Sequence, residues 1–160
     1  MNLAERLSKA NSFDEVFELV KRSVEISIGR HRAGLTLILG DLPNFIGAYH
    51  ILGSNLIVLN KNLLNLVKRK AKSKEEINSY IFTILMHEYL HSLGYTNEEG
   101  VRSLVYNICN EYLGKDHLAT KIAKDPLSIL YPEILNLPSG LSGDFEVVKD
   151  FDKDSMSYIG

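Results

Sequence analysis

Two histidines and a glutamate stand close together in one short stretch, His87-Glu88-Tyr89-Leu90-His91. On a helix, residues four apart lie on one face, so His87 and His91 can offer their imidazoles to one metal ion. Imidazole nitrogen is a favoured ligand of zinc. Glu88 lies one residue further round the helix, where its carboxylate can take a proton from a metal-activated water without binding the metal. The pattern H-E-x-x-H therefore predicts a zinc site with Glu88 as the catalytic general base.

A third protein ligand is expected, because catalytic zinc usually takes three and leaves a fourth position for water. Gly94 can end the motif helix, and the short connection after it predicts an antiparallel helical hairpin. Glu98 would then lie near the bend, beside His91 and on the apolar face of the second helix. We expect Glu98 to complete a site for Zn²⁺, one ion per chain. Glu111 and His117 are the alternatives for this third ligand.

The composition predicts one domain and a tail. A chain of 160 residues that is 45% hydrophobic can build one core. We expect a domain over residues 1–137 and a C-terminal tail over 138–160 that is either disordered or covers a sheet edge. The net charge of −2 does not point to a nucleic-acid or membrane partner. Cys109 is the single cysteine, which excludes an internal disulfide and a cysteine-rich zinc site.

Local signals predict the helices that carry and support the motif. Ser12 begins an S-x-x-E pattern, which is typical of a helix start, and that helix should end before Gly29. Asn60 can cap a short helix through about residue 70. Ser73 begins a second S-x-x-E pattern, from which a helix buried on one side should run through the motif. Thr96 and Glu99 could form a further capping box.

Short apolar runs predict about three strands, at residues 35–39, 46–52 and 56–59. The last two runs are separated by Gly53-Ser54-Asn55, whose turn chemistry predicts a hairpin. We expect 56–59 to be the sheet edge along which an extended substrate binds. His50, in the middle strand, is interpreted as a structural residue on the face of the sheet.

The motif resembles those of the zincin metallopeptidases. The run H-E-Y-L-H-S-L-G-Y-T-N is similar to the metzincin pattern H-E-x-x-H-x-x-G-x-x-H, but Asn97 stands where metzincins have their third histidine. An acidic ligand on the following helix resembles the gluzincins instead, and over about residues 12–115 the chain resembles minimal gluzincin-like proteins of archaea. This resemblance implies an α+β, zincin-like fold. A small, mixed, twisted sheet would pack with an N-terminal helix and a helical hairpin carrying H-E-x-x-H.

The function that this resemblance implies is a zinc metallopeptidase acting on peptides or unfolded proteins. The absence of a signal-like N-terminus and of a long apolar run predicts a soluble, cytoplasmic protein. Tyr95 or Tyr106 could donate a hydrogen bond to the oxyanion.

Two alternatives have different chemistry. The zinc endoribonucleases of rRNA maturation carry H-G-x-L-H-x-x-G-Y-D-H, and Leu90-His91, Gly94 and Tyr95 are in register with it. However, Glu88 and Asn97 replace the glycine and the last histidine of that pattern. The other alternative is a catalytically silent zincin scaffold that binds protein.

Overall fold

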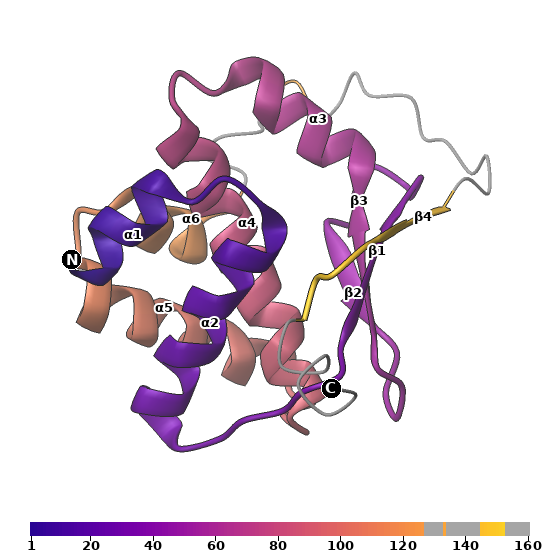
Figure 1. Ribbon diagram of the computed structural model, residues 1–160, viewed down its shortest axis with the longest axis horizontal. Helices are drawn as coiled ribbons and strands as arrows, with labels where there is room; N and C mark the ends of the chain where they lie inside the picture. The colour runs from indigo at the N-terminus through magenta and orange to yellow at the C-terminus, as the bar shows by residue number, and fades with distance from the viewer. Residues whose placement is uncertain (127–132, 134–144, 153–160) are drawn as a thin grey trace.

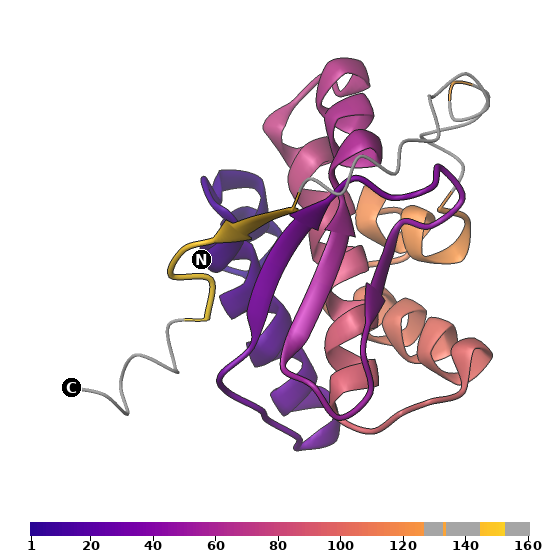
Figure 2. The same ribbon diagram turned by 90° about the vertical axis from the view of Figure 1, so that its right-hand side faces the viewer.

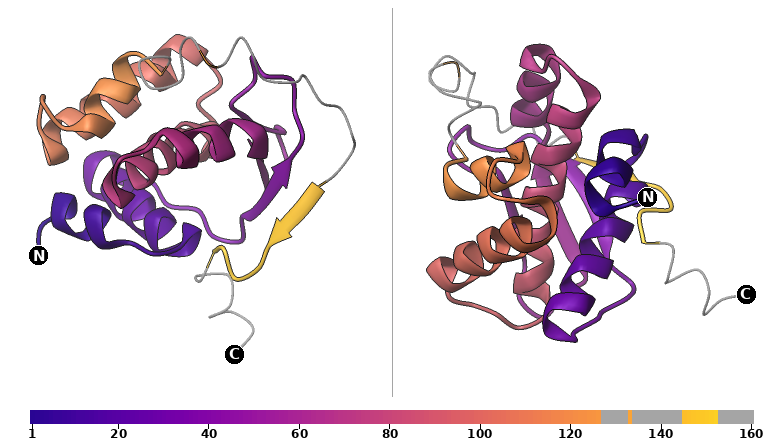
Figure 3. Two further views of the ribbon diagram at one scale, coloured as in Figure 1. Left: turned by 90° about the horizontal axis from the view of Figure 1, so that it is seen from above. Right: turned by 90° about the vertical axis from the view of Figure 1, so that its left-hand side faces the viewer.

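The computed structural model describes residues 1–126, 133 and 145–152, and these residues form two layers (Figure 1). One layer is a four-stranded mixed sheet and the other is a group of six helices. In Figure 2 the sheet faces the viewer and the helices lie behind it, on one of its faces. The view from above keeps the layers apart (Figure 3, left). The fold is therefore mixed α+β, as the sequence predicts.

The order of strands in the sheet corrects two expectations. In spatial order the strands are β2 (Ala48–His50), β3 (Leu56–Asn60), β1 (Thr36–Gly40) and β4 (Phe145–Val148). The sheet has four strands because β4, from near the C-terminus, pairs antiparallel with β1. The prediction that residues 56–59 form an edge is wrong: β3 pairs parallel with β1 on one side and antiparallel with β2 on the other. The edge strand next to β3 is β2.

The predicted hairpin is confirmed, although β2 is shorter than the apolar run that predicted it. Ala48 pairs with Leu59, and His50 pairs with Ile57. Gly53 lies in the connecting turn with a φ of 81°, a conformation that glycine adopts without steric cost.

The described part of the chain contains six helices, and three of them begin where a predicted capping residue places them. The six helices are α1 (Leu3–Lys9), α2 (Phe13–Ile28), α3 (Lys61–Lys70), α4 (Lys74–Ser92), α5 (Glu98–Leu113) and α6 (Leu118–Lys124). The side chains of Ser12, Asn60 and Ser73 each accept a backbone N–H in the first turn of α2, α3 and α4. Each cap satisfies a donor that would otherwise lack a partner, which typically stabilises the helix by ~1 kcal/mol. Within the described part of the chain, no helix is both long and apolar enough to cross a membrane.

Helix α1 has no counterpart in the expectations from sequence. It has seven residues, and Leu7 is its fully buried apolar side chain. The buried amide of Asn78, on α4, donates to the carbonyl oxygens of Leu7 and Ala10 at 2.8 Å each. These long-range hydrogen bonds attach α1 to the motif helix, and a periodic apolar pattern does not reveal them.

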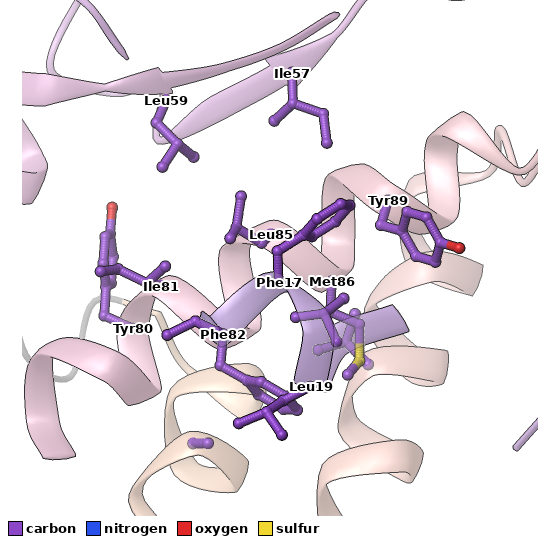
Figure 4. Packing of buried hydrophobic residues seen from close by; sticks show 14 of the residues in the cluster. Phe17, Leu19, Ile57, Leu59, Tyr80, Ile81, Phe82, Leu85, Met86 and Tyr89 are labelled. Carbon is purple, nitrogen blue, oxygen red and sulfur yellow. The ribbon is translucent and has the colours of Figure 1, made fainter. Parts of the chain in front are cut away.

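Helix α4 lies at the centre of the molecule. The helices α1, α2, α5 and α6 are grouped around it (Figure 3, right), and the sheet covers its remaining side. In Figure 4, Leu85 of α4 and Phe17 of α2 both point toward Ile57 and Leu59 of β3. Tyr89 of α4 lies beside Phe17, with ring centroids 5.4 Å apart. The expectation of burial on one side is corrected, because Ser79 and Thr83 are buried as well. Burying each large apolar side chain contributes roughly 1.5–3 kcal/mol, so the helix that carries the motif is firmly held.

The end of the described chain is part of this core. Phe151 stacks on Phe17 with ring centroids 4.2 Å apart. The carboxylate of Asp152 accepts from the Lys21 ammonium at 2.7 Å and from the Leu35 backbone N–H at 3.1 Å. The C-terminal tail was expected either to be disordered or to cover a sheet edge, and its described strand β4 lies at an edge of the sheet beside β1. The expected boundary at residue 138 lies outside the described residues.

The connection between α4 and α5 is short, but the two helices are not an antiparallel pair. Figures 1 and 2 both show α5 crossing α4 at a steep angle. Helix α5 also contacts α1, α2 and α6. The start of α5 therefore lies beside the end of α4, while the rest of α5 leads away from it.

Candidate metal centre

Three of the predicted residues meet where α4 ends and α5 begins. His87 and His91 lie one turn apart near the end of α4, and Glu98 is the first residue of α5. Their ligand atoms all lie within 4.8 Å of one another. Nε2 of His91 is 3.1 Å from one Glu98 carboxylate oxygen, and Nε2 of His87 contacts the other. The three side chains thus converge as a metal site requires.

The residues between α4 and α5 form the turn that places Glu98 beside the two histidines. Gly94 has a φ of 105°, in the region that glycine favours. Its N–H donates to the carbonyl of His91, and the N–H of Tyr95 donates to the carbonyl of Leu90. These two hydrogen bonds are the Schellman arrangement that ends helices. Asn97 then caps α5 by accepting the N–H of Gly100 at 2.7 Å, so the capping box of Thr96 and Glu99 does not form.

A backbone hydrogen bond selects the tautomer of the His91 ring. Its Nδ1 lies 2.7 Å from the carbonyl oxygen of Tyr95. A carbonyl can only accept, so Nδ1 carries the hydrogen in the neutral ring and Nε2 keeps its lone pair. Such a second hydrogen bond is the usual partner of a metal-binding histidine.

The charges at the site favour metal binding. Burial lowers the pKa of His87, and although Glu98 opposes this, the pKa stays below its ordinary value, which favours the neutral imidazole that a metal needs. Burial alone would raise the pKa of Glu98, but His87 and His91 together hold it below its usual range. The carboxylate is therefore ionised at neutral pH. The side chain of Glu98 is 56% exposed, so the expectation that it would be buried on the apolar face of α5 is wrong.

Glu88 is placed beside the three donors and is not one of them. It is 5% exposed. Burial, and then the charge of Glu98, raise the pKa of its carboxyl from 4.5 to about 8. Among the described residues none forms a hydrogen bond with this carboxyl. Its two oxygens are thus available to a water or a substrate.

Two hollows meet at the site. The larger, with a volume of about 660 Å³, extends from His87 along α4 toward α6 and the loop before β2. The smaller, of about 280 Å³, lies between β2 and His91. Ala48, Glu88 and Glu98 line both. A chain laid across the site could therefore extend into both hollows.

Strand β2 lies beside these hollows, and among the described strands its outer edge has no partner. The N–H of Asn60 donates to the carbonyl of Gly47 at 2.8 Å. Hydrogen-bonded pairs alternate along antiparallel strands, so Tyr49 is the next residue of β2 to bond to β3. The N–H and C=O groups of Ala48 and His50 consequently point away from β3, toward the open side.

The alternative third ligands lie away from the site. Glu111 is near the far end of α5 and outside the three-residue cluster. His117 caps α6, where its Nδ1 accepts the N–H of Ala119 at 3.0 Å. Neither Tyr95 nor Tyr106 lines either of the two hollows, so their expected contact with an oxyanion has no support.

Sequence patterns missed two residues that line the hollows and two that hold the motif helix. His50, interpreted as structural, lines the smaller hollow, and Arg102 lines the larger. Arg30 donates to the carbonyl of Leu93 at 2.8 Å, and Arg32 donates to that of Ser92 at 2.7 Å. No spacing rule signals these positions, because each depends on how distant segments pack.

No family model matches the chain, and neither a curated protein nor a solved structure matches it.

Proposed function

We propose that the protein is a zinc-dependent peptidase with a zincin-like arrangement of its site. The observation that carries the proposal is the convergence of His87, His91 and Glu98 beside the buried carboxyl of Glu88. The order of elements adds support, since a mixed sheet with an open edge strand lies over the helix that carries the motif. The resemblance to gluzincins found in the sequence, with an acidic residue of the next helix as third ligand, agrees with this arrangement.

The donor set suits zinc. Two imidazole nitrogens and one carboxylate are the three protein ligands of a common type of catalytic zinc site, which leaves one position open. Zinc, when bound, supplies Lewis acidity that lowers the pKa of water and polarises a scissile carbonyl. The tautomer of His91, held by the Tyr95 carbonyl, already directs a lone pair to the site.

Glu88 is the general base in this proposal. Glu88 follows His87 on the same helix, so its carboxylate adjoins the cluster of His87, His91 and Glu98. Within the described ranges, no residue forms a hydrogen bond with this carboxylate. It would take the proton of the attacking water and pass it to the leaving amine. Burial raises the pKa of this carboxyl to about 8 and makes its ionised form a stronger base. The positive charge of a metal ion held at the cluster would favour that ionised form.

The substrate is an extended peptide segment bound along β2. The outward N–H and C=O groups of Ala48 and His50 can pair with the main chain of a peptide, as an added strand does. Because both residues line the smaller hollow with Glu88 and His91, this pairing would align a peptide bond over the site. Strand β3, which the sequence suggested for this role, is paired with a neighbouring strand along each of its edges.

The test compares zinc-loaded wild type with Glu88→Gln on casein, an unfolded protein, and counts new amino termini. We expect the wild type to cleave casein, and the variant to keep its zinc and lose activity by about 10²-fold or more, because an amide cannot accept the proton. Cleavage of RNA with casein untouched would support the endoribonuclease alternative. Bound zinc with neither substrate cleaved would support the silent scaffold.

A further inference from the structure

The larger hollow contains a cation that the proposed chemistry does not use. Arg102 is on α5, one helical turn beyond Glu98, and lines this hollow together with His87 and Glu88. It is exposed, and it forms no ion pair with any other described residue. Glu98, the acidic neighbour four residues earlier, directs its carboxylate oxygens toward the Nε2 atoms of the two histidines. The guanidinium is therefore available to a ligand in the hollow.

The other walls of the hollow are mainly apolar. Ile84 of α4, Val105 of α5 and Ile122 of α6 line it, and Phe45 stands at it with 79% of its surface exposed. Lys124 and Asp125, at the end of α6, supply charges of opposite sign. Arg102 is thus a charged donor near the metal-binding end of an otherwise largely apolar space.

We propose that Arg102 is a specificity-determining residue that selects substrates with a carboxylate in the larger hollow. This inference rests on the proposed peptidase function, and it adds the class of substrate. A guanidinium can hold a carboxylate through two parallel hydrogen bonds, which fixes both position and orientation.

The helix sets the distance between the selected carboxylate and the cleaved bond. Residues four apart on a helix are separated by about 6 Å along its axis. An extended peptide advances about 3.3 Å per residue. The substrate carboxylate that Arg102 binds should therefore lie within about two residues of the cleaved bond. Either an acidic side chain or the C-terminal carboxylate of a substrate meets this requirement.

The test uses heptapeptide amides of alanine and leucine that carry one Glu at successive positions, each paired with a peptide carrying Gln there. A matching set with a free C-terminal carboxylate separates the two sources of the charge. We expect the wild type to cleave a Glu peptide about tenfold faster than the matching Gln peptide, or a peptide with a free C-terminal carboxylate about tenfold faster than the matching amide. This ratio corresponds to the free energy of one charge-assisted hydrogen bond. Arg102→Ala should lose this preference and keep its zinc. Arg102→Glu should favour Lys-substituted peptides.

Lys121→Ala is the matched control, because Lys121 is exposed on α6 and does not line the hollow. It should keep the preference of the wild type. Equal cleavage of charged and neutral peptides by the wild type, or an undiminished preference in Arg102→Ala, would overturn the inference.

A binding measurement separates this inference from the proposed function. If no peptide is cleaved, the peptidase proposal fails. The zinc-loaded Glu88→Gln protein and its Arg102→Ala derivative are then compared for binding of the same peptides, labelled with fluorescein. Tighter binding of the carboxylate peptides that depends on Arg102 supports the selection, and binding indifferent to the carboxylate overturns it.

Discussion

The Nδ1 atom of His91 lies 2.7 Å from the carbonyl oxygen of Tyr95, four residues later in the chain. This contact links the ligand to the turn that ends α4. The same turn, through Gly94, directs the chain to Asn97 and so places Glu98 at the start of α5. One local structure thus sets both the tautomer of a ligand and the position of the third donor.

Replacing Gly94 with Ala should therefore weaken metal binding. Gly94 has a φ of 105°, where a Cβ costs roughly 1–2 kcal/mol, and relief of this strain would move the Tyr95 carbonyl. We expect zinc affinity to fall by about tenfold or more, as when a second hydrogen bond to a ligand is lost. Competition with a chromophoric chelator measures the affinity.

Gly114→Ala is the control for this change. Gly114 also has a positive φ, of 96°, but it follows the far end of α5. It should lose similar stability and keep its affinity for zinc. Equal affinity in all three proteins would show that the turn does not position the site.

Glu88 should make the stability of the zinc-free protein depend on pH. Burial and the charge of Glu98 raise the pKa of its carboxyl to about 8 in the folded state, against 4.5 in the unfolded chain. The folded state holds the proton more tightly, so this stabilising contribution is full below pH 4.5. It is lost as the pH rises toward and through about 8.

Glu88→Gln should remove this dependence, because its side chain does not titrate. Relative to wild type, the free energy of unfolding of the variant in EDTA should rise by on the order of a few kcal/mol from pH 4.5 to 8. Urea denaturation across this range measures it. Glu99→Gln, which changes an exposed carboxylate on α5, is the control and should follow the wild type. Parallel curves for wild type and Glu88→Gln would contradict the burial of this carboxyl.

Replacing Lys21 with Met should destabilise the protein without affecting zinc. The Lys21 side chain is 2% exposed and lies 2.7 Å from the fully buried carboxylate of Asp152. Removing one partner of a buried pair typically costs about 3–5 kcal/mol. Glu18, 44% exposed, lies 3.5 Å from Lys21, and Glu18→Ala should cost at most about 1 kcal/mol. Similar urea midpoints for the two variants would count against a buried pair joining the C-terminal segment to α2.

Features decided by neighbouring residues could be predicted from the sequence. Ser12, Asn60 and Ser73 cap helices because their side chains reach N–H groups only two or three residues away. His87 and His91 share a face because of helix periodicity alone. The short turn after Gly94 also predicted that Glu98 would lie beside His87 and His91. It did not predict that the Glu98 side chain would be exposed.

Features decided by distant contacts could not be predicted in this way. Strand β4 pairs with β1 across more than a hundred residues, and no local pattern specifies that partner. For the same reason, the local sequence of β3 does not indicate that it pairs with a strand on each side. His50 and Arg102 reach the hollows only because β2 and α5 pack on either side of the site, so neither residue carries a signal in its own neighbourhood.

Zinc content, measured by elemental analysis after dialysis, tests the central claim most directly. We expect about one zinc per chain in the wild type, in Glu99→Ala and in Glu111→Ala. The His87→Ala, His91→Ala double variant should bind none, and Glu98→Ala should lose most of its zinc because one of three donors is missing. Equal zinc in the wild type and the double variant, or zinc lost with Glu111 and kept without Glu98, would contradict the account.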